Sequence, residues 1–110
     1  MVKQGDIIKV SFDPQSGHEQ AGYRPAVIVS SDYFIEKTKL VIACPITNTN
    51  NRFPTHVPLD ERTKTTGVIL CEHIRSLDLN SRPHSVTETL PDDILKKVID
   101  IIFSEIDDIT

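Results

Sequence analysis

The chain has 110 residues, of which 12 are Lys or Arg and 16 are Asp or Glu, and its formal net charge at pH 7 is −4. A chain of this length forms a single domain, residues 1–110, around one modest core. Its mildly acidic charge excludes a uniformly basic nucleic-acid-binding surface, and no apolar run approaches the roughly 20 residues that span a bilayer.

Sequence near the N-terminus lacks the apolar stretch of a signal peptide, which favours a cytoplasmic protein without a membrane segment. The excess of acid lies in the last 20 residues, because residues 1–90 carry equal numbers of acidic and basic side chains. Cys44 and Cys71 lie in apolar segments without the spacing of a zinc site or a redox pair. We therefore expect both to be buried, reduced thiols.

Short apolar segments along the first two thirds of the chain predict β-strands. Ile8, Val10 and Phe12 alternate with polar residues and predict a half-buried first strand. Asp32 could cap a short helical turn that runs through Lys37. Four further strands are predicted, at residues 26–30, 40–44, 56–59 and 67–71. Pro45 is expected to end the strand at residues 40–44, the third along the chain.

The C-terminal segment predicts an amphipathic helix. Pro91 suits the first helical position, and Asp92 and Asp93 suit the positive end of the helix dipole. The apolar residues recur at helical spacing, at Ile94, Leu95, Val98, Ile101, Ile102 and Ile106. Several short strands followed by one helix predict a mainly β fold, in which a small curved sheet forms a partial barrel and the helix covers one opening.

Reactive side chains are concentrated in the loop that precedes the second strand. His18, Glu19, Gln20 and Arg24 supply proton acceptors, proton donors and a fixed cation within seven residues. Such a set suits general acid/base attack on a phosphodiester. A glycine-punctuated loop with solvated charges explains the same residues equally well. A basic groove and scattered surface charges also remain alternatives for Arg24, Arg52, Arg62, Lys64, Arg75 and Arg82.

Several motifs together resemble the MazF/PemK family of toxin endoribonucleases. They are Gly5-Asp6-Ile7, Phe12-Asp13-Pro14, Gly17-His18-Glu19-Gln20-Ala21-Gly22, Arg24-Pro25-Ala26-Val27, Pro45-Ile46-Thr47, Gly67-Val68 and Ile74-Arg75-Ser76-Leu77-Asp78. The resemblance covers about residues 5–105. It implies an SH3-like small β-barrel of the CcdB/PemK type with a C-terminal helix. It also implies a homodimer that cleaves single-stranded RNA without metal or another cofactor and is neutralised by a MazE-like antitoxin.

Carried over by position, the resemblance makes Arg24 and Thr47 catalytic. It places His18, Glu19 and Gln20 in the RNA-binding loop, with Glu72 and Arg75 as supporting residues. The family commonly has Asp-Gln where this chain has Glu72-His73. The general base is therefore either Glu72 or a combination of Arg24 and Thr47 supported by Glu19, and we favour the combination. The remaining histidines, His56, His73 and His84, lack metal-site spacing and are expected to be exposed or satisfied by hydrogen bonds.

Two functions without catalysis are compatible with the same fold. One is a toxin that inhibits DNA gyrase by binding it, and the other is an RNA-binding module that only grips phosphates. Arg24 together with Thr47 favours catalysis, because a binding module does not need an arginine and a hydroxyl at two adjacent strand ends. The cleaved RNA sequence is expected to depend on the loops around residues 47–55 and 62–66.

Overall fold

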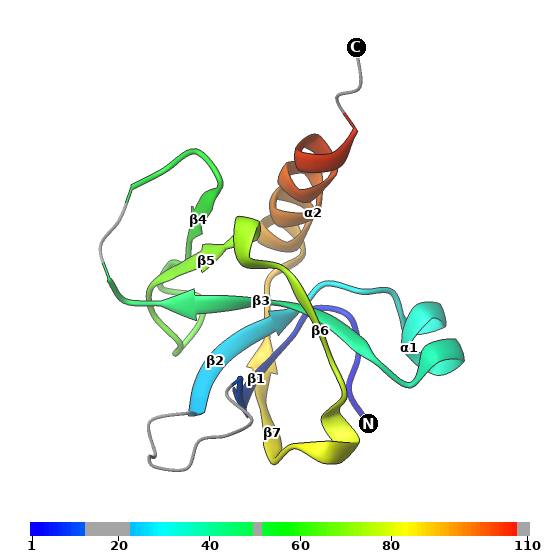
Figure 1. Cartoon of the computed structure of the whole chain (residues 1–110). Helices are drawn as coiled ribbons and strands as arrows, with labels where there is room; N and C mark the ends of the chain where they lie inside the picture. The colour runs from blue at the N-terminus through cyan, green and yellow to red at the C-terminus, as the bar shows by residue number, and fades with distance from the viewer. Residues whose placement is uncertain (13–22, 50–51, 108–110) are drawn as a thin grey trace.

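Seven antiparallel strands and two α-helices make up the part of the chain that the computed structural model describes, residues 1–12, 23–49 and 52–107 (Figure 1). The strands are β1 (Asp6–Ser11), β2 (Tyr23–Ile28), β3 (Val41–Thr47), β4 (His56–Pro58), β5 (Val68–Leu70), β6 (Arg75–Leu77) and β7 (His84–Thr89). The helices are α1 (Asp32–Thr38) and α2 (Asp92–Ile106), with 3-10 turns η2 (Cys71–His73) and η3 (Leu79–Ser81). The expected mainly β fold with a C-terminal helix is confirmed.

Strand β3 connects the two parts of the sheet. The strand order is β4-β5-β3-β2-β1-β7, and β6 also pairs with β3. On one edge β3 pairs with β2. On its other edge it pairs first with β6, through residues 41–43, and then with β5, through residues 46 and 47. The sheet therefore divides at β3, and the 3-10 turn η2 joins its two branches.

The prediction that Pro45 ends the third strand is wrong, because β3 continues through Pro45 to Thr47. A proline has no N–H to give to a sheet partner and is tolerated where a partner is missing. Pro45 lies in the gap between the β6 and β5 pairings on that edge of β3, and on the other edge it stands opposite Ala26. The gap allows the strand to continue and to carry Thr47.

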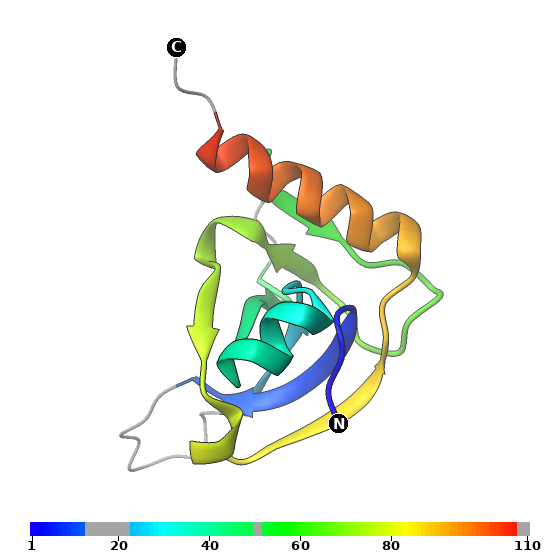
Figure 2. The same cartoon turned by 90° about the vertical axis from the view of Figure 1, so that its right-hand side faces the viewer.

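Both faces of the central strands are buried. Residues of β2 alternate between two apolar clusters, with Val27 in the first and Ala26 and Ile28 in the second. The first cluster lies under α2, which contributes Ile94, Val98 and Ile102 at helical spacing, and Figure 2 shows this helix lying across one side of the curved sheet. Burial of each such side chain is worth about 1.5 to 3 kcal/mol. The second cluster includes strand residues of β1, β2, β3 and β6.

Local details differ from the predictions at both helices. Ser31, not Asp32, is the N-cap of α1, because its hydroxyl accepts a hydrogen bond from the backbone N–H of Phe34 at 3.1 Å. Pro91 is the N-cap of α2 rather than its first residue.

Strands β6 and β7 were not predicted. The six residues of β7 are mostly exposed and lack an apolar alternation, so only their pairing with β1 identifies them as a strand.

Candidate active site

Arg24 and Thr47 lie on neighbouring strands at the same end of the sheet. The register of β2 with β3 pairs Ala26 with Pro45. Continuing this register by two residues, within the bounds of both strands, places Arg24 opposite Thr47. Neighbouring strands are about 5 Å apart, and residues that stand opposite each other share a face. The guanidinium and the hydroxyl therefore project from the same face.

Thr47 is held by its surroundings on the β5 side. Its hydroxyl oxygen accepts a hydrogen bond from the backbone N–H of Thr49 at 3.1 Å, which leaves the hydroxyl hydrogen to be donated elsewhere. Thr66 donates to the side chain of Asn48 at 2.9 Å. Gly67 has a φ of +118°, and a Cβ built on it would be 2.3 Å from the carbonyl oxygen of Thr47. Only glycine fits this close approach of the two backbones.

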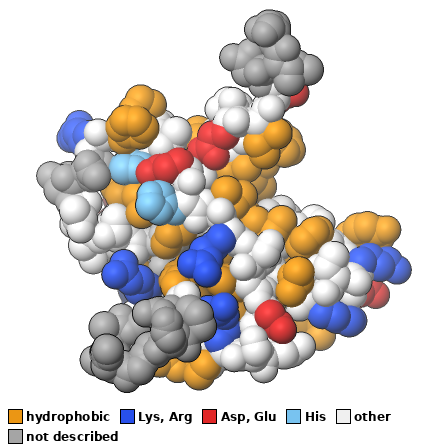
Figure 3. All heavy atoms as spheres, in the orientation of Figure 1, with side chains coloured by type: hydrophobic (Ala, Val, Ile, Leu, Met, Phe, Trp, Pro, Cys, Tyr) orange, Lys and Arg blue, Asp and Glu red, His pale blue; other side chains and the backbone are white. Residues whose placement is uncertain are grey.

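Arg75 adds a second cation to the same face. It pairs with Ala43 on the far edge of β3, and Ala43 shares the face of Thr47 by the two-residue period of a strand. The guanidinium carbon of Arg75 lies 5.3 Å from the centroid of the Phe12 ring, a cation–π distance. Figure 3 shows Lys and Arg side chains gathered on this side of the molecule. Arg24 and Arg75 therefore project from the same face of the sheet, on opposite sides of β3.

Glu72 belongs to a different cluster. Its carboxylate accepts a hydrogen bond from the Thr55 hydroxyl at 2.6 Å and lies 2.8 Å from Nε2 of His56. His73 lies 3.6 Å away. Partial burial favours the neutral acid, but the hydrogen bonds from Thr55 and His56 outweigh it, so the pKa of Glu72 lies below its ordinary value. A carboxylate stabilised in this way is a poor proton acceptor.

Two of the other candidate basic residues, Arg62 and Arg82, have partners of their own. Arg62 makes bidentate contacts with Asp60 and Asp93, which hold the pKa values of both carboxyls below their ordinary values. Arg82 donates to the backbone carbonyl of Ser11 at 2.6 Å. Arg62 is therefore tied to the start of α2. Arg52 is exposed and precedes β4.

Three predicted site residues, His18, Glu19 and Gln20, lie outside the described residues. Within residues 1–12, 23–49 and 52–107, no group of three or more His, Cys, Asp or Glu side chains could hold a metal ion. No helix among these residues is both long and apolar enough to cross a membrane. Cys44 and Cys71 are buried free thiols, as predicted, and burial raises the pKa of Cys71 to about 12.

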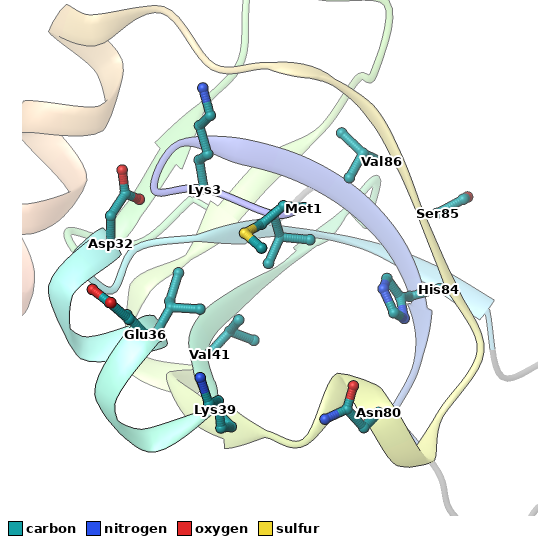
Figure 4. Close-up of a pocket in the computed structure, with 12 residues that line it drawn as sticks. Met1, Lys3, Asp32, Glu36, Lys39, Val41, Asn80, His84, Ser85 and Val86 are labelled. Atoms are coloured by element: carbon teal, nitrogen blue, oxygen red, sulfur yellow. The ribbon is translucent and has the colours of Figure 1, made fainter.

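A cavity of about 900 Å³ lies elsewhere, between the N-terminal residues, α1 and β7 (Figure 4). Its apolar lining includes Val2, Ile35 and Val41, and Lys3 and Lys39 also line it. None of the candidate catalytic residues lines this cavity. We therefore place the candidate active site outside this cavity, at the ends of β2 and β3 that carry the exposed Arg24 and the half-buried Thr47.

Comparison with known proteins places the chain in a family. The family model described as "PemK-like, MazF-like toxin of type II toxin-antitoxin system" matches residues 3–103. The chain is 36% identical over 102 residues to endoribonuclease PemK of Escherichia coli, covering 89% of this chain and 77% of that protein. It is 37% identical over 78 residues to endoribonuclease toxin MazF of E. coli strain K12, covering 71% of this chain and 69% of that protein.

Solved structures agree with this placement. A crystal structure of MazF from Deinococcus radiodurans has a TM-score of 0.82 and 36% identity, with 94% of each chain covered. A MazE–MazF complex from the same organism has a TM-score of 0.84 and 33% identity, also with 94% of each chain covered. The chain therefore belongs to the PemK-like, MazF-like toxins of type II toxin-antitoxin systems. The curated relatives described above are endoribonucleases.

The close approach at Gly67 generates a prediction. Gly67→Ala combines an unfavourable positive φ with a methyl group that meets the Thr47 carbonyl. We expect a loss of about 1 to 3 kcal/mol in the free energy of unfolding. We also expect at least a tenfold loss of RNA cleavage, because small displacements of catalytic groups are costly. Urea unfolding and cleavage rates would measure both, with the exposed Glu61→Ala as control. Parental stability in Gly67→Ala would contradict this account.

Proposed function

We propose that this endoribonuclease toxin cuts single-stranded RNA with the ribose 2′-OH as nucleophile. The 2′-oxygen attacks the adjacent phosphorus, and the bond from phosphorus to the 5′-oxygen breaks. One proton leaves the 2′-oxygen and another reaches the 5′-oxygen, so the products are a 2′,3′-cyclic phosphate and a 5′-hydroxyl. The juxtaposition of Arg24 and Thr47 at adjacent ends of β2 and β3 carries the proposal.

Each of these two side chains suits one need of the transition state. Arg24 is exposed, and a guanidinium can donate to two phosphoryl oxygens at once. The Thr47 hydroxyl already accepts from the Thr49 N–H, so its hydrogen can be donated to a phosphoryl oxygen or to the 2′-oxygen. Donors aimed at developing charge contribute several kcal/mol to such reactions. The nucleophile belongs to the substrate, so the protein need not generate one at a metal ion.

The identity of the proton acceptor is part of the proposal. Glu72 has Thr55 and His56 as partners, and its lowered pKa makes it a weak base. These contacts favour the alternative in which Arg24 and Thr47 act without Glu72 and Glu19 assists them. Arg75 contributes a phosphate contact on the same face. We assign Glu72 a structural role beside the site.

Assembly and inhibition extend the proposal. We propose a homodimer, supported by exposed apolar side chains on α2, with Phe103 63% and Ile106 70% exposed. We also propose that a MazE-like antitoxin covers the RNA-binding face, since relatives have been solved with an antitoxin.

The two proposals have separate tests. Sedimentation should show a dimer at micromolar concentration, and the antitoxin should displace labelled RNA from the protein. An active monomer, or simultaneous binding of RNA and antitoxin at saturation, would contradict the respective part.

The nucleophile can be tested directly with substrate analogues. The purified protein is incubated with a pool of unstructured RNA, with and without a chelator, and the cut positions are mapped from the new ends. We expect cleavage in both conditions, with 2′,3′-cyclic phosphate ends. A single 2′-deoxy substitution at the nucleotide before the cut should abolish cleavage, because it removes the attacking oxygen. The same substitution two nucleotides away is the control, and equal cleavage of both RNAs would refute the mechanism.

Variants at the two strand ends separate catalysis from binding. Arg24→Ala and Thr47→Ala should each lower kcat/KM by roughly 10²-fold or more, because each removes a donor to the phosphorane. Arg24→Ala should also weaken RNA affinity, whereas Thr47→Ala should mainly lower kcat. Thr47→Ser keeps the hydroxyl and should retain most activity. Thermal unfolding should change little. Cleavage by both alanine variants within threefold of the parent would exclude these assignments.

A further inference from the structure

An exposed aromatic ring stands in the segment that joins β3 to β4. Phe53 is 59% exposed. The backbone N–H of His56 donates to the carbonyl of Phe53 at 2.9 Å and closes a tight turn. The Phe53 ring lies against the imidazole of His56, with 5.6 Å between centroids and 50° between planes. The His56 imidazole therefore supports one side of the Phe53 ring, and the rest of the ring is open to solvent.

The support beneath Phe53 is itself fixed. The His56 side chain is only 6% exposed, and its Nε2 lies 2.8 Å from the Glu72 carboxylate. The same carboxylate accepts from the Thr55 hydroxyl, and the Thr55 carbonyl accepts from the Cys71 N–H at 3.2 Å. The turn at Phe53 is thus tied to η2 through both backbone and side chain. An aromatic group ordered before a ligand arrives loses little further conformational entropy on binding.

The sheet register relates this turn to Thr47. Val57 of β4 and Ile69 of β5 stand opposite each other and point into the core under α2. Neighbouring residues along a strand point to opposite faces, so His56, next to Val57, points away from this core. Thr47 of β3 pairs with the residue before Ile69 and therefore points to the same face as His56. Two strand spacings, about 10 Å, separate β4 from β3. Figure 3 shows histidine and basic side chains on the same visible side.

Charge around the turn favours RNA as the occupant. Arg52 precedes Phe53 and is exposed, and Arg24 and Arg75 lie on the common face. On the other side of His56, its Nε2 lies against the carboxylate of Glu72. The basic side chains, rather than this paired carboxylate, are the groups available to a phosphate. Aromatic faces next to cations are how proteins bind single-stranded nucleic acids without strict sequence demands.

From this arrangement we infer that Phe53 is a stacking platform for one nucleobase of the RNA next to the cleaved phosphate. Stacking there would fix the strand before reaction and favour bases with large, flat faces at one position. The inference rests on the proposed RNA cleavage at Arg24 and Thr47 and adds a binding position to that site. Glu72 is then a positioning residue, because it acts on RNA through His56 and Phe53.

The test compares four variants on a mapped RNA substrate. Phe53→Ala and Phe53→Leu should raise KM about tenfold with little change in kcat, as expected for loss of one stacked base. Phe53→Trp should keep or lower KM. Tyr33→Ala is the control, since Tyr33 is a 70% exposed aromatic on α1. Thermal unfolding should be unchanged in all four, because both Phe53 and Tyr33 are exposed.

A fluorescent base locates the contact. An RNA made uncleavable by a 2′-deoxy group at the cut carries 2-aminopurine at successive positions. One position should be quenched on binding the parent or Phe53→Trp, and not on binding Phe53→Leu. Glu72→Ala should raise KM in the parent and have no further effect in Phe53→Ala, because both act through one contact. Additive effects of these two substitutions would overturn the positioning role of Glu72.

The outcomes separate this inference from the proposed function. If the parent cuts no RNA, the proposed function fails. If the parent cuts RNA and Phe53→Leu matches it in KM and in 2-aminopurine quenching, the stacking inference alone is overturned. If Phe53→Leu binds the antitoxin more weakly while its RNA cleavage is parental, Phe53 is a protein-contact residue, and the inference is again overturned.

Discussion

The way in which β3 divides its outer edge between two strands is the constraint on which the site depends. Pairing with β6 covers residues 41–43 and pairing with β5 covers residues 46 and 47, and Pro45 occupies the gap between them. An ordinary residue there would have a backbone N–H without a strand partner on that edge. Proline removes this donor, so the strand continues to Thr47 with both branches of the sheet attached.

Two consequences follow for the chemistry. Continuation of β3 to Thr47 brings this residue to the same end of the sheet as Arg24 of β2, so the two catalytic candidates stand on neighbouring strands rather than on a loop. Separation of β5 from β6 requires the short connection η2, which carries Glu72 toward β4. Backbone pairing is rigid on the scale that catalysis requires, whereas side chains on loops need further support. Glu72, His56 and Thr55 supply that support for the turn at Phe53.

The pattern of apolar residues in the sequence predicted much of the fold, and the features that it missed have physical causes. The first five strands and α2 carry apolar residues at the period of their structure, so they could be found. Strand β7 is exposed along most of its length and is defined by hydrogen bonds to β1 alone. Pro45 was interpreted from its local effect, although its tolerance depends on which strands lie beside it. Such information comes from long-range pairing and is absent from a local pattern.

The candidate site, like the fold, could be predicted from the sequence only in part. Arg24 and Thr47 could be named from a resemblance in motifs, but only the register between β2 and β3 brings them together. The partners of Glu72 could not be predicted, since Thr55 and His56 lie 17 and 16 residues away along the chain without a motif that links them. Phe53 had no predicted role either. An aromatic residue within a polar loop was the available signal, and its meaning depends on the fixed imidazole beneath it.

Two carboxylates in this fold, those of Glu72 and Glu88, are held by hydrogen bonds from neighbouring segments. Glu88 accepts from the backbone N–H groups of Lys64 and Thr65 and from the Thr65 hydroxyl. Burial would raise its pKa, but these bonds lower it below the ordinary value, as for Glu72. Because each pKa is lowered by folding, the charged carboxylate stabilises the fold at pH values above the pKa of the unfolded chain. This stabilisation is lost as the pH falls through the pKa of the folded protein. A carboxylate whose charged form is stabilised by its neighbours holds chain segments in place and takes up a proton less readily than a free one. This difference is the physical basis for proposing a general base other than Glu72.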